Sequence, residues 1–92
     1  MAQYRIVSWK GIPSLVEAED GGEPVRRPLS QRFQDLIDAV AMREGASETE
    51  AYLEGWETAD GGERPGPPQT VAEAVAAELE ESFERLVNDR LR

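Results

Sequence analysis

The residues best suited to chemistry form one arginine-rich stretch, Arg26-Arg27-Pro28-Leu29-Ser30-Gln31-Arg32, just before and inside the start of an expected helix. A helix N-terminus offers free N–H groups and partial positive charge, so it attracts anions. Arginine adds paired donors for phosphate or carboxylate. Arg26, Arg27 and Arg32 are therefore candidate contacts for an anion or an acidic partner. Alternatively, this stretch is a solvated edge whose arginines pair with the chain's own carboxylates.

Two tryptophans are the other candidate contacts. Trp9 stands beside a turn signal at residues 11–13, and Trp56 follows closely after Tyr52. Tryptophan is enriched among the residues that anchor protein interfaces. A small chain also needs large side chains for its core, so a core position and an interface position stay open for both residues.

Several kinds of chemistry are excluded by composition. The chain of 92 residues has no histidine and no cysteine, and Lys10 is its only lysine. Ser-His-Asp and Cys-His nucleophilic sites, disulfide redox chemistry and the usual zinc sites are therefore ruled out. Glu80 and Glu84 lie four apart on the last expected helix, but di-metal helical sites also need histidine, so we expect a solvent face there. We predict no enzyme, no catalytic residue, no metal site and no cofactor.

The charge distribution bears on the choice of partner. The net charge is −9, and residues 46–92 hold twelve acidic but only four basic side chains. Such a chain repels phosphate backbones, so we do not expect nucleic acid as a partner. The acidic half suits a basic protein surface, or it simply keeps the domain in solution. No apolar run is long enough to span a membrane and no signal peptide is evident, so the expected location is the cytoplasm.

The first half of the chain predicts three strands and a helix. Residues 3–9, 14–19 and 23–27 are expected to form strands, the last at a sheet edge because prolines interrupt its hydrogen bonding. Ser30 is a good N-cap residue, and Gly45 suits the left-handed position that ends a helix. Between them, one apolar stripe consists of Phe33, Leu36, Ile37 and Val40.

The second half is less regular. Ser47 and Glu50 match a capping box, which favours a short helix, whereas the aromatic content favours a strand over residues 51–57. We prefer the strand. The Gly- and Pro-rich residues 58–69 predict a connecting loop. Thr70 is then expected to cap one long helix over residues 71–91.

These elements predict a single α+β domain over residues 1–92, in the order β-β-β-α-β-α. It is expected to be a small two-layer domain, with two amphipathic helices covering one face of a short, mainly antiparallel sheet. The other sheet face would stay open. Such an open face, rich in tryptophan and tyrosine, is a candidate contact surface.

Several segments together resemble a known family. They are Tyr4 to Lys10 with Ile12-Pro13, Arg26 to Gln34 running into Leu36 to Ala39, Tyr52-Leu53-Glu54-Gly55-Trp56, Glu63 to Gly66, and the Ala-rich last helix. The chain resembles the small bacterial "virulence factor" domain family over nearly its whole length. Members occur alone or appended to helical repeats. Stand-alone members look to be encoded near proteins similar to methylenetetrahydrofolate reductase and to corrinoid methyltransferases, which implies an accessory role in one-carbon transfer. Residues 58–62 depart from the more aromatic, basic stretch expected there.

The sequence therefore favours a non-catalytic interaction or accessory subunit, possible partners being a methylenetetrahydrofolate reductase-like protein or a corrinoid methyltransferase. The expected contact residues are Trp9, Arg26, Arg27, Arg32 and Trp56. On this hypothesis, Arg27→Glu abolishes partner binding and leaves thermal unfolding nearly unchanged. The alternative is a module that binds a small anionic ligand through the cluster between Arg26 and Arg32. Homodimerisation through the open sheet face is a further possibility.

Overall fold

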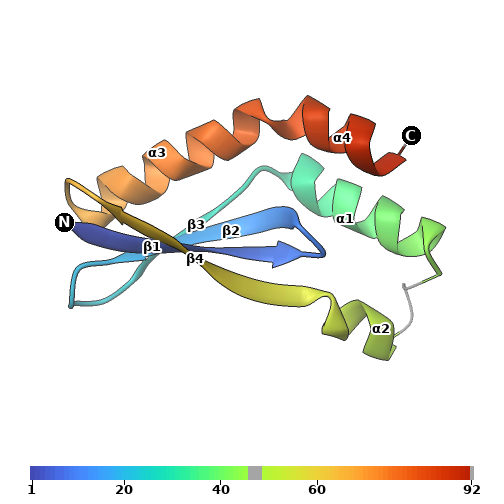
Figure 1. Ribbon diagram of the computed structural model, residues 1–92, viewed down its shortest axis with the longest axis horizontal. Helices are drawn as coiled ribbons and strands as arrows, with labels where there is room; N and C mark the ends of the chain where they lie inside the picture. The colour runs from blue at the N-terminus through green and yellow to red at the C-terminus, as the bar shows by residue number, and fades with distance from the viewer. Residues whose placement is uncertain (46–48, 92) are drawn as a thin grey trace.

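A four-stranded antiparallel sheet in the order β3-β2-β1-β4 is the centre of the computed structural model, which describes residues 1–45 and 49–91. The strands are β1 (Ala2–Trp9), β2 (Ile12–Glu19), β3 (Val25–Pro28) and β4 (Trp56–Arg64). The helices are α1 (Gln31–Arg43), α2 (Thr49–Glu54), α3 (Pro68–Glu81) and α4 (Phe83–Leu91). The predicted α+β class is confirmed, although the order contains two more helices than expected (Figure 1).

The β1–β2 hairpin closes through the two residues Lys10 and Gly11. Both have positive φ angles, 46° and 86°, and such turns match the right-handed twist of the flanking strands. The Arg90 side chain of α4 donates a hydrogen bond to the Lys10 carbonyl oxygen. The expected break at Gly11 is therefore the tip of a hairpin, held by the last helix.

The long loop predicted for residues 58–69 is wrong over its first half. β4 runs on to Arg64, and its pairing with β1 shifts between Tyr4–Gly62 and Arg5–Asp60, which leaves Gly61 as the extra residue of a β-bulge. A Cβ atom on Gly61 would overlap the ring of Tyr4. The two glycines look like a turn in sequence, but here Gly61 leaves room for an aromatic ring over a bulged strand, and Gly62 adopts a positive φ of 112° beside it.

The single long helix predicted for residues 71–91 is also wrong. α3 begins at Pro68 rather than after Thr70, and the helix breaks at Ser82 before α4. The Ser82 hydroxyl donates to the Leu79 carbonyl oxygen at 2.7 Å. A serine side chain that bonds the backbone competes with helical hydrogen bonding. The break places Phe83 edge-on to Phe33 of α1, with ring centroids 5.0 Å apart.

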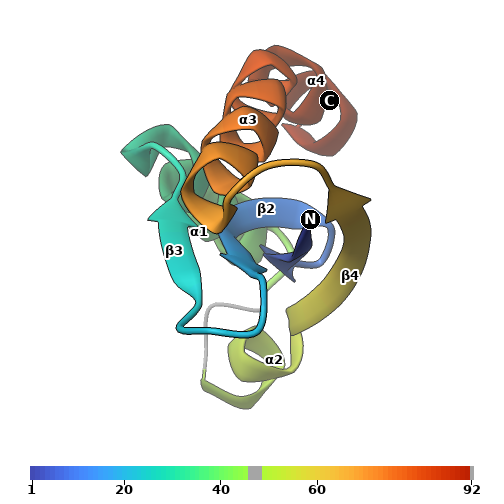
Figure 2. The same cartoon turned by 90° about the vertical axis from the view of Figure 1, so that its left-hand side faces the viewer.

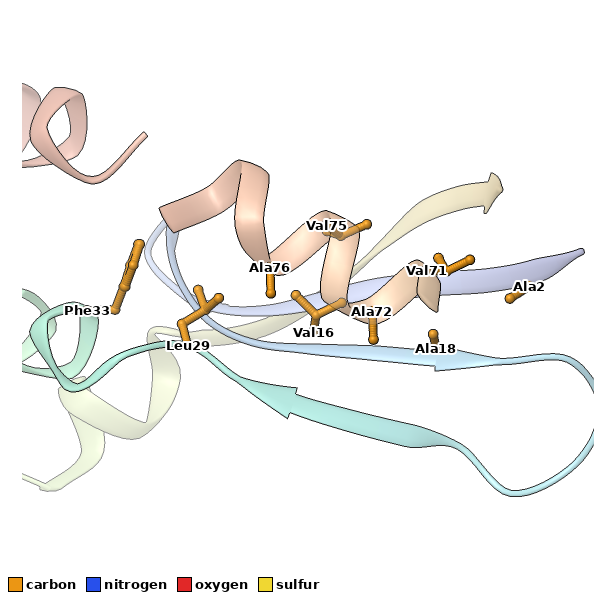
Figure 3. Packing of buried hydrophobic residues seen from close by; sticks show 9 residues of the cluster. All are labelled: Ala2, Val16, Ala18, Leu29, Phe33, Val71, Ala72, Val75 and Ala76. Atoms are coloured by element: carbon orange, nitrogen blue, oxygen red, sulfur yellow. The ribbon is translucent and has the colours of Figure 1, made fainter. Parts of the chain in front are cut away.

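Two hydrophobic clusters form the core. The first fills the space between α3 and the sheet, and Figure 3 shows its side chains pointing from both layers toward one another. It comprises Ala2, Val16, Ala18, Leu29, Phe33, Val71, Ala72, Val75 and Ala76. The second lies at the hairpin end of the sheet and comprises Trp9, Ile12, Leu36, Ile37, Val40 and Ala41. Figure 2 shows that α3 and α2 lie on opposite sides of the sheet.

The strand preferred for residues 51–57 is wrong over most of its length, because residues 49–54 are helical. Ser47, the first residue of the proposed capping box, lies outside the described residues. The Tyr52 ring stacks on Trp9 at 5.7 Å between centroids, and the Trp9 indole N–H donates to the Tyr52 carbonyl oxygen at 2.7 Å. This contact across the fold ties α2 to the end of the sheet.

Candidate functional site

The sheet face that α3 leaves bare carries a row of charges. On β1 the side chains of Tyr4 and Ile6 pack on the core, so Arg5 and Val7 point to the opposite side. The register brings one residue of each strand into line across this side, in the order Arg26, Glu17, Arg5, Asp60. Charges of alternating sign thus cross the whole sheet.

Glu17 holds the centre of this row. Its carboxylate pairs with Arg5 Nε at 3.1 Å and with Arg26 Nε at 3.0 Å, and its side chain is only 17% exposed. The hydrogen bond to Glu17 raises the pKa of the Arg5 guanidinium, with smaller contributions from Glu19 and Asp60. Arg26 remains 64% exposed, so its unused N–H groups face solvent. Ion pairs hold the side chains of Arg26, Glu17 and Arg5 together, and the row still presents hydrogen-bond donors and acceptors to solvent.

A second, largely apolar row lies beside the first. Its members are aligned by the same register, in the order Pro28, Leu15, Val7, Thr58. Leu15 and Val7 are partly buried, whereas Pro28 and Thr58 at the two ends are exposed. We call the two rows together the open face. An aliphatic strip beside fixed charges is suited to protein contact.

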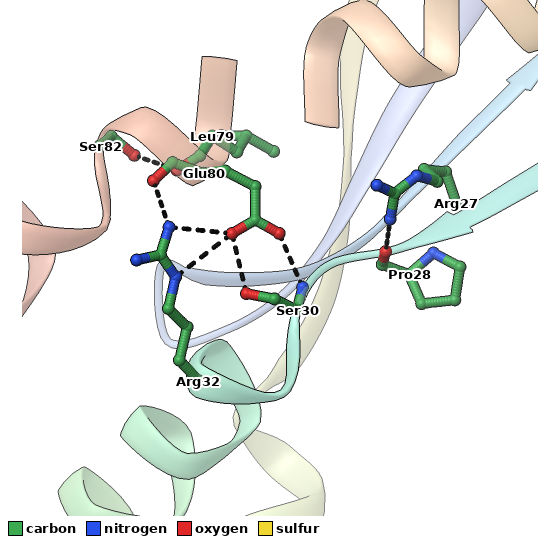
Figure 4. Close-up of polar contacts among 7 residues, drawn as sticks. All are labelled: Arg27, Pro28, Ser30, Arg32, Leu79, Glu80 and Ser82. Carbon is green, nitrogen blue, oxygen red and sulfur yellow. Dashed lines mark hydrogen bonds and ion pairs between the residues drawn. The ribbon is translucent and has the colours of Figure 1, made fainter. Parts of the chain in front are cut away.

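The predicted arginine cluster does not converge on one site. Arg26 points to the open face, whereas Arg27 points to the other side and pairs with Glu73 of α3 at 2.9 Å. Arg32 pairs with Glu80 at 3.0 Å (Figure 4). Its guanidinium lies 4.5 Å from the ring centroid of Phe83. The alternative interpretation, in which these arginines pair with the chain's own carboxylates, describes all three.

The N-terminus of α1 already holds an anion, the carboxylate of Glu80. It accepts hydrogen bonds from the Ser30 backbone N–H at 2.7 Å and from the Ser30 hydroxyl at 2.8 Å (Figure 4). Partial burial raises the pKa of Glu80, but the bonds from Ser30 and Arg32 outweigh it, and the pKa lies below its usual value. The sequence placed Glu80 on a solvent face, because nothing local indicates a contact 50 residues away.

The two tryptophans differ in exposure. Trp9 is fully buried, so the prediction that it anchors a partner is wrong, and its core alternative holds. Trp56 is partly buried at the start of β4, with its ring 5.9 Å from that of Tyr52. The exposed part of the Trp56 side chain therefore lies beside the open face, on the same side of β4 as Thr58.

A second surface feature was missed by the sequence. α1 and α2 flank a hollow of about 370 Å³ lined by Asp38, Ala41, Met42 and Tyr52. Met42 is 71% exposed although it follows the apolar stripe of α1. The spacing between Val40 and Met42 places Met42 off the apolar stripe of α1. This spacing was the signal in the sequence that Met42 is exposed.

Comparison with known protein families shows which family this chain belongs to. Residues 7–91 match the family described as "Virulence factor". The chain belongs to this family. The matched region includes nearly all of the open face, as well as α1, α3 and the contact between Ser30 and Glu80. No curated protein and no solved structure matches the chain. Among the described residues, no helix is both long and apolar enough to cross a membrane.

Proposed function

We propose that this chain is a non-catalytic interaction subunit and that the open face is its contact surface. One observation carries the proposal: α3 packs on one side of the sheet, while Leu15 and Val7 on the other side lie between exposed ends at Pro28 and Thr58. Covering such aliphatic groups is favourable by roughly 25 cal/mol per Å².

The charged row supports specificity in the same contact. Glu17 holds Arg5 and Arg26 in place before any partner arrives, so less side-chain entropy is lost on binding. The alternating signs of the row favour a partner with the complementary order of charges and disfavour others. Affinity would then come mainly from the apolar row, and orientation from the charged row.

The resemblance to stand-alone family members extends the proposal to a class of partner. We propose that the subunit serves a folate- or corrinoid-dependent methyl-transfer system in the cytoplasm, and that it binds a methylenetetrahydrofolate reductase-like protein or a corrinoid methyltransferase. The alternative, a module for small anionic ligands, would require an anion to displace Glu80 from Ser30. We therefore prefer the protein partner.

Affinity capture of the tagged protein from its host, followed by mass spectrometry, tests this proposal. The test variant is Leu15→Lys, which places a charge in the apolar row, where a lysine stem can still lie along the surface. The matched control is Met42→Lys, the same kind of change at an exposed site on α1. We expect stoichiometric recovery of a methyltransferase or reductase with the wild type and the control, and at least tenfold less with Leu15→Lys. Equal recovery with both variants, or recovery of the bait alone, contradicts the proposal.

A further inference from the structure

The two edges of the sheet differ in their capacity to accept another strand. β3 has four residues, contains Pro28 and follows Pro24, and proline cannot donate a backbone hydrogen bond. β4 has nine residues, none of them proline, and within residues 1–45 and 49–91 its strand partner is β1, on one side only. Such an edge presents N–H and C=O groups that can pair with another chain.

One hydrogen bond shows which backbone groups of β4 point away from β1. The Lys10 N–H donates to the Gly55 carbonyl oxygen at 2.9 Å, next to the facing pair Trp9–Trp56. In an antiparallel ladder, the pair beside such a bond is not itself hydrogen-bonded, so the backbone groups of Trp56 point away from β1. The same holds for every second residue, Thr58 and Asp60, up to the bulge at Gly61. Residues 56–60 therefore form a regular free edge.

The side chains along this edge select the charge of its occupant. Glu57 and Asp60 are both exposed, one on each face of β4, and Glu54 precedes the strand. The basic residue of β4, Arg64, is already held by Glu78 at 2.6 Å. A second copy of the chain would bring the same acidic side chains together, and each copy carries a net charge of −9. Charge complementarity thus favours a basic strand over self-pairing.

We propose that the edge formed by residues 56–60 accepts an extended, basic segment of a partner protein, which joins the sheet as a fifth strand. The inference rests on the proposed function and names the chemistry of the partner. Apolar side chains of the added strand would lie beside Trp56 and Thr58 on the open face, and basic side chains beside Glu57 and Asp60. The bulge at Gly61 ends the pairing.

Amide NMR of the full chain tests this inference, with a short synthetic peptide that has valine where it would face Trp56 and Thr58 and lysine where it would face Glu57 and Asp60. We expect shift changes concentrated at residues 55–61, and weaker binding at higher salt. The same peptide with glutamate in place of lysine should not bind. Shift changes centred on another element, or equal binding of the acidic peptide, would overturn the inference.

A pair of variants at one position separates backbone pairing from side-chain contact. Thr58→Pro removes an outward N–H, and proline is tolerated at an edge whose N–H faces solvent. Thr58→Val keeps that N–H and the shape of the side chain. We expect binding about tenfold weaker for Thr58→Pro and unchanged for Thr58→Val. Equal peptide binding by both variants refutes strand addition. A wild-type dimer in light scattering that Thr58→Pro dissociates would instead assign the edge to a second copy of the chain, which overturns the basic partner segment as its occupant.

The two proposals fail in different ways in the capture experiment. If Leu15→Lys loses the partner while Thr58→Pro retains it, the open face is the contact surface and the edge is not used. If Leu15→Lys retains the partner, the proposed function itself fails, whatever the peptide titration gives.

Discussion

Replacing Glu80 with alanine removes the carboxylate that joins the end of α3 to the beginning of α1. In the structure this group accepts bonds from the Ser30 N–H at 2.7 Å, the Ser30 hydroxyl at 2.8 Å and Arg32 at 3.0 Å. Charge-assisted hydrogen bonds contribute about 1.5–3 kcal/mol each where they are buried. Ser30 and Arg32 are exposed, so water replaces part of each bond. We expect the free energy of unfolding to fall by about 2 kcal/mol in total.

Urea unfolding followed by circular dichroism measures this loss. For a domain of this size, about 2 kcal/mol corresponds to a fall in Tm of roughly 10 °C. The control is Glu81→Ala on the neighbouring, exposed residue, which should change stability by no more than about 0.5 kcal/mol. If Glu80→Ala and Glu81→Ala unfold alike, the carboxylate does not hold the two helices together.

The pH dependence of Glu80→Gln gives a second test of the same contact. The pKa of Glu80 lies below its usual 4.5 in the folded chain. Its stabilising contribution is therefore fully present above pH 4.5, and it is lost as the pH falls through the folded pKa. The wild type should exceed Glu80→Gln in stability at neutral pH, and the difference should shrink in acid. A difference that stays constant into acid would refute the assignment.

Three further substitutions test the packing. Gly61→Ala should destabilise the fold by about 1–3 kcal/mol in thermal unfolding, because its Cβ would overlap the ring of Tyr4. Trp9→Phe should cost about 2 kcal/mol in urea unfolding, because it removes buried volume and the indole N–H bonded to α2. Arg27→Glu should lower stability by up to about 1 kcal/mol, because it opposes Glu73, and it should leave partner capture intact, contrary to the expectation from sequence.

Each of these changes has a control on the same chain. Gly22→Ala should be nearly neutral, since the nearest atom to its Cβ would be a flexible Asp20 oxygen at 3.8 Å. Trp56→Phe should cost less than Trp9→Phe, since Trp56 is only partly buried. Arg85→Glu, at an exposed position on α4, should leave stability within about 0.5 kcal/mol. A control that matches its test variant would contradict the corresponding argument.

The candidate site was only partly predictable. The sequence indicated an open sheet face and an exposed arginine at position 26, and both are present. The face was expected to be rich in tryptophan and tyrosine, but its two rows are charged and largely aliphatic. It could not show that Glu17 joins Arg26 to Arg5, because that row depends on the register of three strands. Nor could it show that Arg27 and Arg32 are held by carboxylates of α3, 46 and 48 residues further along the chain.

The sequence by itself determined the elements whose signals are local. α1 follows Ser30, buries Phe33, Leu36, Ile37 and Val40 on one stripe, and is followed by Gly45 at φ 72°. The break in the first strand at Gly11 was also predicted, whereas its form, a two-residue turn at Lys10 and Gly11 with β2 beginning at Ile12, was not. A helical stripe and a positive-φ glycine are properties of neighbouring residues, so a short window of sequence contains them.

Tertiary structure alone decided the remainder. The contact with Trp9 stabilises Tyr52 within a helix, although its neighbours suit a strand. The ring of Tyr4 crosses Gly61 and extends β4 through residues that read as a turn. Glu80 takes the anion position at the N-terminus of α1 that the sequence assigned to a ligand or an acidic partner. In each case a contact between residues more than 40 positions apart outweighs local preferences of about 1 kcal/mol, which a short window cannot reveal.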